Sequence, residues 1–381
     1  MKILEFDNGD FVEGWDFSRV KLQSVNLFVG ATGAGKSKML NAIFGVGHKA
    51  VTDQPPIAQG YWHVLFEHDS QKFLWDYQCK PMPNGSRAIT KEVVKQIHRD
   101  GGEVTIVERD KSNINFNGSS LPKLSSTSSV LYTLREESLI EPAFQGFKRI
   151  MRRNFFEGEL AQAAGFQEVP SQLRTALKKK KSLETLFTEN LSLSVRLFLL
   201  QQFFPDKFKQ IVEYYKSIFP FIKSCDVQDL SQLSHAGFPF QIPGRQVPVF
   251  TIQESRVPKP IPYQLISSGM QKVLLIITDI MMLPGGTVYL IDEYENSLGI
   301  NAINFLPSFL DEQKADNQII ITSHHPYLIN AIPIKNWFVF NRVGSKITIK
   351  PGTELAERYG RSKQAIFTQL MNDPFYTEGV K

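Results

Sequence analysis

The stretch NLFVGATGAGKSKML, residues 26–40, joins an apolar, strand-like run to a glycine-rich turn and then to the start of a helix-like apolar repeat. The turn follows the spacing G-x-x-x-x-G-K-[ST], in which glycines let backbone N–H groups converge on phosphate oxygens and the following helix adds its positive end. We expect Lys36 to reach the β- and γ-phosphates and the Ser37 hydroxyl to bind Mg²⁺. The sequence therefore predicts a nucleoside triphosphate site made by Gly30, Ala31, Thr32, Gly33, Ala34, Gly35, Lys36 and Ser37.

A second apolar run, TVYLIDEYENSLG at 287–299, contains two adjacent carboxylates at its polar end. Such a continuous run is typical of a buried parallel strand, whose carboxyl end is where α/β sheets bind ligands. We expect Asp292 to hold Mg²⁺ through water or Ser37, and Glu293 to orient and polarise the attacking water. Taken alone, the same pattern also fits a strand end with solvated acids.

Two more segments have groups suited to a γ-phosphate. In LISSGMQKVLLIITDIMML, the turn Ser267-Ser268-Gly269 opens an apolar helix, so the Ser267 hydroxyl and the Gly269 backbone would lie at a helix N-terminus. An ordinary serine N-cap explains that turn equally. In QIIITSHHPYLI, His324 stands at a strand end, where it would contact the γ-phosphate or the attacking water. A structural histidine is the alternative.

The distribution of apolar residues along the chain predicts an α/β fold with a mixed sheet and an inserted helical lobe. Strand-like segments occur within 1–30, 61–79 and 103–109, and 42% of the 381 residues are hydrophobic, which is enough for a large core. From about Pro122 to about Cys225, apolar residues recur at three- and four-residue spacing, which is typical of helices. The helical pattern includes FQGFKRIMRRNFF at 144–156.

Composition restricts the class of protein. The chain has no apolar run of the roughly 18 residues that a membrane span needs and no signal-peptide pattern, so we expect a cytoplasmic protein without a membrane partner. Two distant cysteines indicate neither a disulfide framework nor a zinc site. The net charge is +5, and the basic runs at 148–153 and 177–181 are candidates for nucleic-acid contact, with solvated helix faces as the alternative.

The order of these motifs resembles the ABC-type ATPase heads. The resemblance is to the SMC, RecF and DNA-repair branch and to the OLD-like and Septu (PtuA-like) ATPases of bacterial antiphage defence. Residues 30–37 match Walker A, 266–271 the signature motif, 290–293 Walker B and 295–299 the D-loop, and His324 takes the place of the switch histidine. Ser268, Met270 and Gly299 depart from the usual pattern, and the sequence does not place a Q-loop glutamine.

The resemblance implies a division of the chain and a way of working. The expected segments are an N-terminal ATPase lobe (1–120), a helical insert (121–235), a C-terminal ATPase lobe (236–345) and a helical tail (346–381). In this family, the signature of one head completes the nucleotide site of another. The resemblance therefore implies ATP-dependent homodimerisation, with Ser267, Ser268 and Gly269 acting on the γ-phosphate bound to a second copy, and with Glu293 and His324 as catalytic residues.

Three functions remain open from the sequence. The first is an ATP-driven sensor or clamp of an antiphage defence complex, which controls a separate effector nuclease or toxin docked on the C-terminal helix or on the lobe at 150–225. The second is a RecF-like DNA-repair ATPase that binds duplex through Lys178 to Lys181, Arg152 and Arg153. The third is a nucleotide-gated scaffold that hydrolyses ATP very slowly.

Overall fold

The computed structural model describes residues 1–56, 59–83, 85–153, 157–188, 190–233, 246–295, 298–313, 316–359 and 363–380. The chain forms two compact units. The first unit comprises Met1–Arg153, Gly285–Tyr294 and Lys314–Lys381, and the second comprises Asn154–Pro284 and Glu295–Gln313. Each unit is described by itself, and the segment boundaries expected from the sequence remain predictions.

The first unit is built on a 15-stranded sheet in which a parallel part continues into an antiparallel part. Its order is β10-β9-β8-β7-β6-β5-β1-β2-β18-β17-β4-β16-β15-β11, with β3 paired to β1. The strands are β1 (Lys2–Asp10), β2 (Asp16–Phe17), β3 (Val20–Lys21), β4 (Val25–Val29), β5 (Gly60–His68), β6 (Gln71–Pro81), β7 (Arg87–Ile97), β8 (Glu103–Arg109), β9 (Ile114–Phe116), β10 (Ser119–Ser120), β11 (Ile150–Arg153), β15 (Val288–Ile291), β16 (Gln318–Ser323), β17 (Trp337–Val343) and β18 (Lys346–Pro351). The strands predicted near 61–79 and 103–109 are confirmed.

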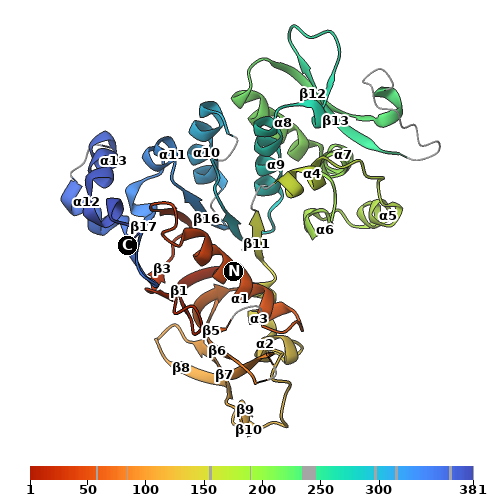
Figure 1. The fold of residues 1–381 in the computed structure, drawn as a ribbon. Helices are drawn as coiled ribbons and strands as arrows, with labels where there is room; N and C mark the ends of the chain where they lie inside the picture. The colour runs from red at the N-terminus through yellow and green to blue at the C-terminus, as the bar shows by residue number, and fades with distance from the viewer. Residues whose placement is uncertain are drawn as a thin grey trace. The chain divides into compact units, whose positions relative to one another are not determined.

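The parallel part of the sheet positions the motifs. Strands β11, β15, β16, β4 and β17 run parallel to one another, and the middle three are almost fully buried, as their continuous apolar runs predict. Because parallel strands have their carboxyl ends at one edge of the sheet, the glycine-rich loop after β4, the carboxylates after β15 and the histidines after β16 meet there. Figure 1 labels β11, β16 and β17 of this part of the sheet.

Helices cover the first unit, and the longest follows the glycine-rich loop. The helices are α1 (Lys36–Val51), α2 (Val130–Thr133), α3 (Glu141–Phe147), α11 (Pro326–Ala331), α12 (Gly352–Tyr359), α13 (Lys363–Asn372) and α14 (Pro374–Thr377), with a 3₁₀ turn at Ile334–Asn336. Helix α1 buries Met39, Leu40, Ile43 and Val46, an apolar stripe at helical spacing that joins the main core. Helix α3 places Phe147 against Phe66 and Trp75 of the antiparallel strands.

The helix predicted through 144–156 is wrong over Ile150–Arg153, and residues 154–156 of that prediction lie outside the described residues. Helix α3 ends at Phe147, and Ile150–Arg153 form β11, which pairs with β15 in parallel register. This short run forms strand hydrogen bonds with β15, and Ile150 packs against Gly47 of α1. Its apolar residues therefore pack as part of the sheet and not as one face of a helix. Tertiary pairing thus overrides the local period.

The second unit contains helices and a small sheet. Its helices are α4 (Glu157–Ala164), α5 (Ser171–Lys179), α6 (Leu183–Thr188), α7 (Leu193–Phe203), α8 (Pro205–Ile218), α9 (Ser268–Met282) and α10 (Ile300–Gln313), with 3₁₀ turns at Leu230–Leu233 and Tyr263–Leu265. The antiparallel sheet has the order β12 (Ile222–Asp229), β13 (Pro248–Glu254), β14 (Ile261–Pro262). Helix α9 is buried at every residue from Lys272 to Met282, and its Asp279 pairs with Arg196 of α7 at 2.6 Å.

Candidate functional site

The glycine-rich loop runs from the end of β4 to the start of α1, and its glycines are required by its geometry. Gly33 and Gly35 have φ angles of 86° and 103°, in the left-handed region that favours glycine. A Cβ on Gly30 would lie 2.9 Å from the Phe340 carbonyl oxygen, and one on Gly35 would lie 2.4 Å from Ile347 Cδ1. The loop is therefore a close-packed cradle at the N-terminus of α1, as the motif predicts.

Lys36 lies over this loop. Its side chain is buried, and Nζ donates hydrogen bonds to the carbonyl oxygens of Gly30 at 2.8 Å and Ala31 at 3.1 Å. The ammonium group is thus placed at the mouth of the cradle, where the P-loop lysine contacts phosphate.

A chain of hydrogen bonds links the cradle to the acidic strand end. Ser37 Oγ donates to Asp292 Oδ1 at 2.9 Å, and Thr322 Oγ1 donates to the same oxygen at 2.7 Å. The backbone N–H of Glu293 in turn donates to Thr322 Oγ1 at 2.8 Å. Glu293 has a φ of 46°, a conformation that non-glycine residues rarely adopt and that is enriched at functional sites.

Arg152 is the second partner of Asp292. Its Nη2 lies 3.2 Å from Asp292 Oδ2, its Nη1 donates to Asn41 Oδ1, and only 14% of its side chain is exposed. The sequence suggested this arginine as a nucleic-acid contact or part of a solvated helix. In the structure it lies on β11 and neutralises the carboxylate that is predicted to bind Mg²⁺.

A cavity of about 240 Å³ opens in front of these groups. Lys36, Ser37, Glu293, Thr322 and His324 line it, so the structure brings both predicted catalytic residues to the phosphate-binding loop. Thr322 was missed by the sequence reasoning, although a polar residue at the end of the apolar strand QIIITS could have indicated it.

Trp15 and Arg342 also line the cavity, and the sequence reasoning missed both. The Trp15 ring lies 4.4 Å from the Arg342 guanidinium and 4.3 Å from Lys38 Nζ, both cation–π contacts. Arg342 Nη1 also donates to the Gly33 carbonyl oxygen at 3.2 Å. No local motif marks either residue, because they come from the connection after β1 and from β17.

The remaining predicted groups lie in the second unit. Ser267 is the N-cap of α9 and its hydroxyl accepts a hydrogen bond from the Met270 N–H at 3.4 Å, while Ser267 and Ser268 are both exposed. The described structure therefore does not bring Ser267, Ser268 and Gly269 together with Lys36 in one unit. Of the predicted D-loop, residues 296 and 297 lie outside the described residues.

The residues around the cradle fit a nucleoside triphosphate with Mg²⁺. A Cβ on Gly33 would have its nearest neighbour 3.9 Å away, so the loop is open there, and Ser37 and Asp292 supply a neighbouring hydroxyl and carboxylate. Within the described ranges, no three His, Cys, Asp or Glu side chains gather into a metal centre made by protein alone. The Ser37 hydroxyl beside the Asp292 carboxylate suits Mg²⁺, which is usually bound by one or two carboxylates together with substrate phosphates.

The fold is similar to that of SMC head domains. The head of an SMC protein bound to the C-winged helix domain of ScpA has a TM-score of 0.50 at 10% identity, over 92% of this chain and 97% of that chain. The predicted α/β class with a mixed sheet is thereby confirmed. Also similar are the SMC head domain from Thermotoga maritima (TM-score 0.44, 14% identity, 92% and 99% coverage) and the Pyrococcus furiosus Smc head with an extended coiled coil bound to the C-terminal domain of ScpA (0.45, 12%, 94% and 99%).

The chain belongs to the P-loop ATPase family AAA_21, described as "AAA domain, putative AbiEii toxin, Type IV TA system", which matches residues 108–330, more than half of its length. The matched range contains Asp292, Glu293 and His324, and the glycine-rich loop precedes it. A search of curated proteins gives no match. None of the described helices has the length and apolar character to cross a bilayer.

Proposed function

We propose that the protein binds ATP with Mg²⁺ and hydrolyses it. The observation that carries this proposal is the hydrogen-bond chain from Ser37 through Asp292 and Thr322 to the backbone of Glu293. It joins the phosphate-binding loop to the strand end that presents a candidate base. Ser37, Thr322 and Glu293 line the same cavity, and Asp292 accepts hydrogen bonds from the first two.

Each residue then has a definite task. Lys36 and the loop N–H groups would bind the phosphates, while Ser37 and Asp292 would hold Mg²⁺. When bound, Mg²⁺ would neutralise phosphate charge and orient the reacting phosphoryl group. Glu293 orients the attacking water and accepts its proton, and His324 contacts the γ-phosphate or that water. Thr322 positions both acids through its hydroxyl.

We further propose that ATP acts as a clamp between two copies of this chain. Ser267 is exposed at the start of a fifteen-residue helix, so it is accessible to a second molecule. Ser267, Ser268 and Gly269 would contact the γ-phosphate bound to Lys36 of the other copy, and hydrolysis would remove the bridge and release the dimer. The membership of a family whose description names a toxin system supports a sensor or regulator of a separate nuclease or toxin in bacterial antiphage defence.

The test is molecular mass by light scattering, with and without ATP and Mg²⁺, together with ATP turnover. We expect wild type to dimerise with ATP, Glu293→Gln to bind ATP and hold the dimer longer, and Lys36→Ala to lose ATP binding. A molecular mass that does not change on addition of ATP in any of the three proteins would contradict the clamp. ATP turnover that Glu293→Gln leaves unchanged would contradict the catalytic assignment.

The second candidate is a DNA-binding ATPase of the RecF or SMC type. The observation that favours it is the run Lys178 to Lys181 at the end of α5, where all four lysines are exposed. Contacts to phosphates release counterions, so duplex binding through this run would weaken steeply with salt. Replacing all four lysines by glutamine should reduce both ATP-dependent duplex affinity and its salt dependence. Unchanged duplex binding would remove this candidate.

A further inference from the structure

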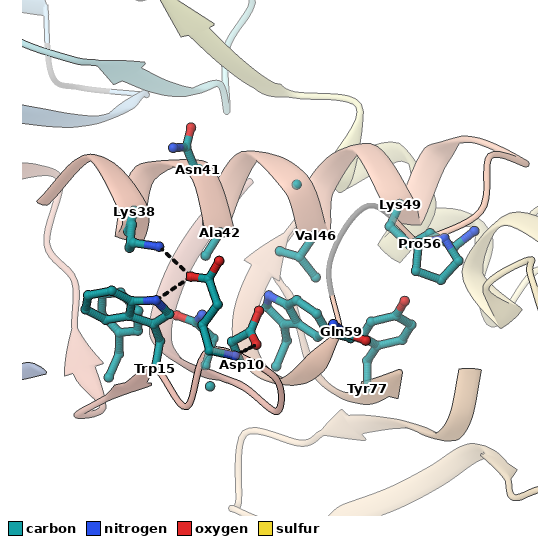
Figure 2. A pocket seen from close by; sticks show the side chains of 16 residues that line it. Asp10, Trp15, Lys38, Asn41, Ala42, Val46, Lys49, Pro56, Gln59 and Tyr77 are labelled. Atoms are coloured by element: carbon teal, nitrogen blue, oxygen red, sulfur yellow. Dashed lines mark hydrogen bonds and ion pairs between the residues drawn. The ribbon is translucent and has the colours of Figure 1, made fainter. Parts of the chain in front are cut away.

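A groove of about 260 Å³ lies between α1 and the antiparallel part of the sheet in the first unit. One face of α1 forms its roof, from Lys38 through Ala42 and Val46 to Lys49, a spacing that keeps these residues on one side of a helix. Figure 2 shows α1 running along the groove, with Trp15 toward the Lys38 end and Tyr77 toward the Lys49 end. The volume is near the lower end of the roughly 300–1,000 Å³ that is typical of ligand pockets.

Three residues of the groove floor, Asn8, Trp62 and Tyr77, belong to one unusual row of the sheet. Asn8, Trp62, Tyr77, Glu92 and Arg109 stand directly opposite one another on β1, β5, β6, β7 and β8, so their side chains share one face. The row two residues further along is wholly apolar and consists of Phe6, Val64, Trp75, Val94 and Val107. Because the neighbouring row is apolar, the polar atoms of this row need hydrogen-bond or ion-pair partners from elsewhere.

Two of these five residues have strong polar partners and the other three do not. Arg109 pairs with Glu92 at 3.0 Å, and the Glu92 carboxylate also accepts from the Val130 N–H. At the groove end, Asn8 Oδ1 and Trp62 Nε1 are buried without a hydrogen-bond partner among the described residues, and the Tyr77 hydroxyl has only the Cys79 thiol beside it, a weak partner. Their exposures of 7%, 7% and 3% make them exceptions to the rule that buried polar atoms are paired.

Gly45 keeps the roof of the groove open. It stands in the middle of α1, where glycine is a poor helix former, and a Cβ added to it would meet no atom within 4 Å. The helix therefore lacks a side chain at the point where one would fill the groove.

The groove adjoins the candidate nucleotide cavity. Trp15 and Lys38 line both spaces. Glu13 joins these two residues, since its carboxylate accepts from Lys38 Nζ at 3.1 Å and from Trp15 Nε1 at 2.5 Å. Asp10 and Glu13 also line the groove, and these carboxylates disfavour an anionic occupant.

We propose that this groove binds a planar nitrogen heteroaromatic ring of the nucleobase type. The rings of Trp15, Trp62 and Tyr77 offer stacking surfaces, Trp62 offers an N–H donor and Asn8 an amide acceptor, so a purely apolar ligand would leave polar atoms unpaired. Such a ring has two sources: the base of the nucleotide whose phosphates lie on Lys36, or a free nucleoside. The first source rests on the proposed ATP binding, and the second does not.

The probes that separate these sources are adenosine, guanosine, ATP and tripolyphosphate, the last two tested with Mg²⁺. Binding is measured by quenching of tryptophan fluorescence and by calorimetry. Gly45→Leu fills the groove, Tyr77→Phe removes one hydroxyl, and Phe44→Leu changes the exposed side of α1 as the matched control. Melting temperatures of all variants establish that each is folded. Tyr77→Phe should melt no lower than wild type, because the Tyr77 hydroxyl makes only a weak hydrogen bond in the free protein.

We expect a nucleoside to bind wild type, Gly45→Leu to abolish nucleoside binding, and Tyr77→Phe to weaken it by about threefold to tenfold, the loss of one hydrogen bond. If the ring is the base of the bound nucleotide, Gly45→Leu weakens ATP but not tripolyphosphate, and ATP displaces adenosine. If it is a free nucleoside, Lys36→Ala retains nucleoside binding and ATP does not compete.

The proposal is overturned if neither nucleoside binds wild type and Gly45→Leu retains the full affinity for ATP. That result would mean that the groove holds only water and no nucleobase. It differs from a failure of the proposed ATP site, in which Lys36→Ala would bind ATP and tripolyphosphate as wild type does.

Discussion

Ser37 and Asp292 are 255 residues apart in the chain, yet the Ser37 hydroxyl donates to Asp292 Oδ1 at 2.9 Å. The contact arises because β4 and β15 are both paired with β16, so their carboxyl ends lie at one edge of the sheet. A hydroxyl and a carboxylate at this spacing fit the protein half of the proposed Mg²⁺ site, and the hydroxyl of Thr322 completes the hydrogen-bond network.

Thr322→Val should separate chemistry from nucleotide binding. Valine keeps the shape of threonine but removes the hydroxyl that holds Asp292 and the Glu293 backbone. We expect kcat for ATP hydrolysis to fall by about 10–100-fold, which is the usual loss when a residue that hydrogen-bonds to a metal ligand is replaced. The change in ATP affinity should be smaller. Steady-state turnover and ATP titration measure the two effects. Thr278→Val, which removes a buried hydroxyl in α9, is the control, and equal losses in both variants would refute the role of Thr322.

Arg152→Gln should strengthen Mg²⁺ binding. The guanidinium lies 3.2 Å from Asp292 Oδ2, and a positive charge at that distance repels a divalent cation that binds the same carboxylate. We expect the Mg²⁺ concentration for half-maximal binding of a fluorescent ATP analogue to fall several-fold. Arg174→Gln, on the exposed side of α5, provides the comparison. A higher Mg²⁺ requirement in Arg152→Gln would show that the arginine positions Asp292 rather than competes with the ion.

Substitutions at Gly33 and Gly35 should differ in stability, although both residues have positive φ. Alanine at either position costs about 1–2 kcal/mol of left-handed strain. At Gly35 the new Cβ would also lie 2.4 Å from Ile347 Cδ1, whereas at Gly33 its nearest neighbour would be 3.9 Å away. Urea unfolding should therefore give a clearly lower free energy of unfolding for Gly35→Ala. Equal losses would mean that Ile347 moves aside without cost.

Arg109→Met should destabilise the first unit strongly, because it leaves Glu92 buried without its ion partner. The expected loss is about 3–5 kcal/mol, and the double variant Glu92→Leu/Arg109→Met should recover much of it. Burial already raises the pKa of Glu92 to about 7 against the attraction of Arg109, and removal of Arg109 raises it further.

The pH dependence of the Arg109→Met variant follows from that direction. A carboxyl with a raised folded-state pKa keeps its proton where the unfolded chain has lost it, so the variant loses stability as pH rises above about 4.5, the unfolded value. Thermal unfolding at pH 5 and pH 8 measures the difference from wild type. A variant that instead gains stability relative to wild type with rising pH would contradict the assignment.

The sequence determined the parts of the site that are local. The phosphate-binding loop is a single turn between a strand and a helix, so the order and spacing of Gly30 to Ser37 carry its geometry. Asp292 and His324 were recognisable because each follows a buried apolar strand. Helical periodicity misled at 148–153, because only the neighbouring β15 makes that segment a strand.

Only the tertiary structure decided which distant groups share a space. Thr322 and Arg152 reach Asp292 through strand order, and Asn8, Trp62 and Tyr77 form one row through the register of three antiparallel strands. A register shift of one residue would turn each of these side chains to the opposite face, so no short pattern in the sequence encodes their meeting. Local chemistry is fixed by neighbours in the chain, and the groove beneath α1 is fixed by pairing between strands.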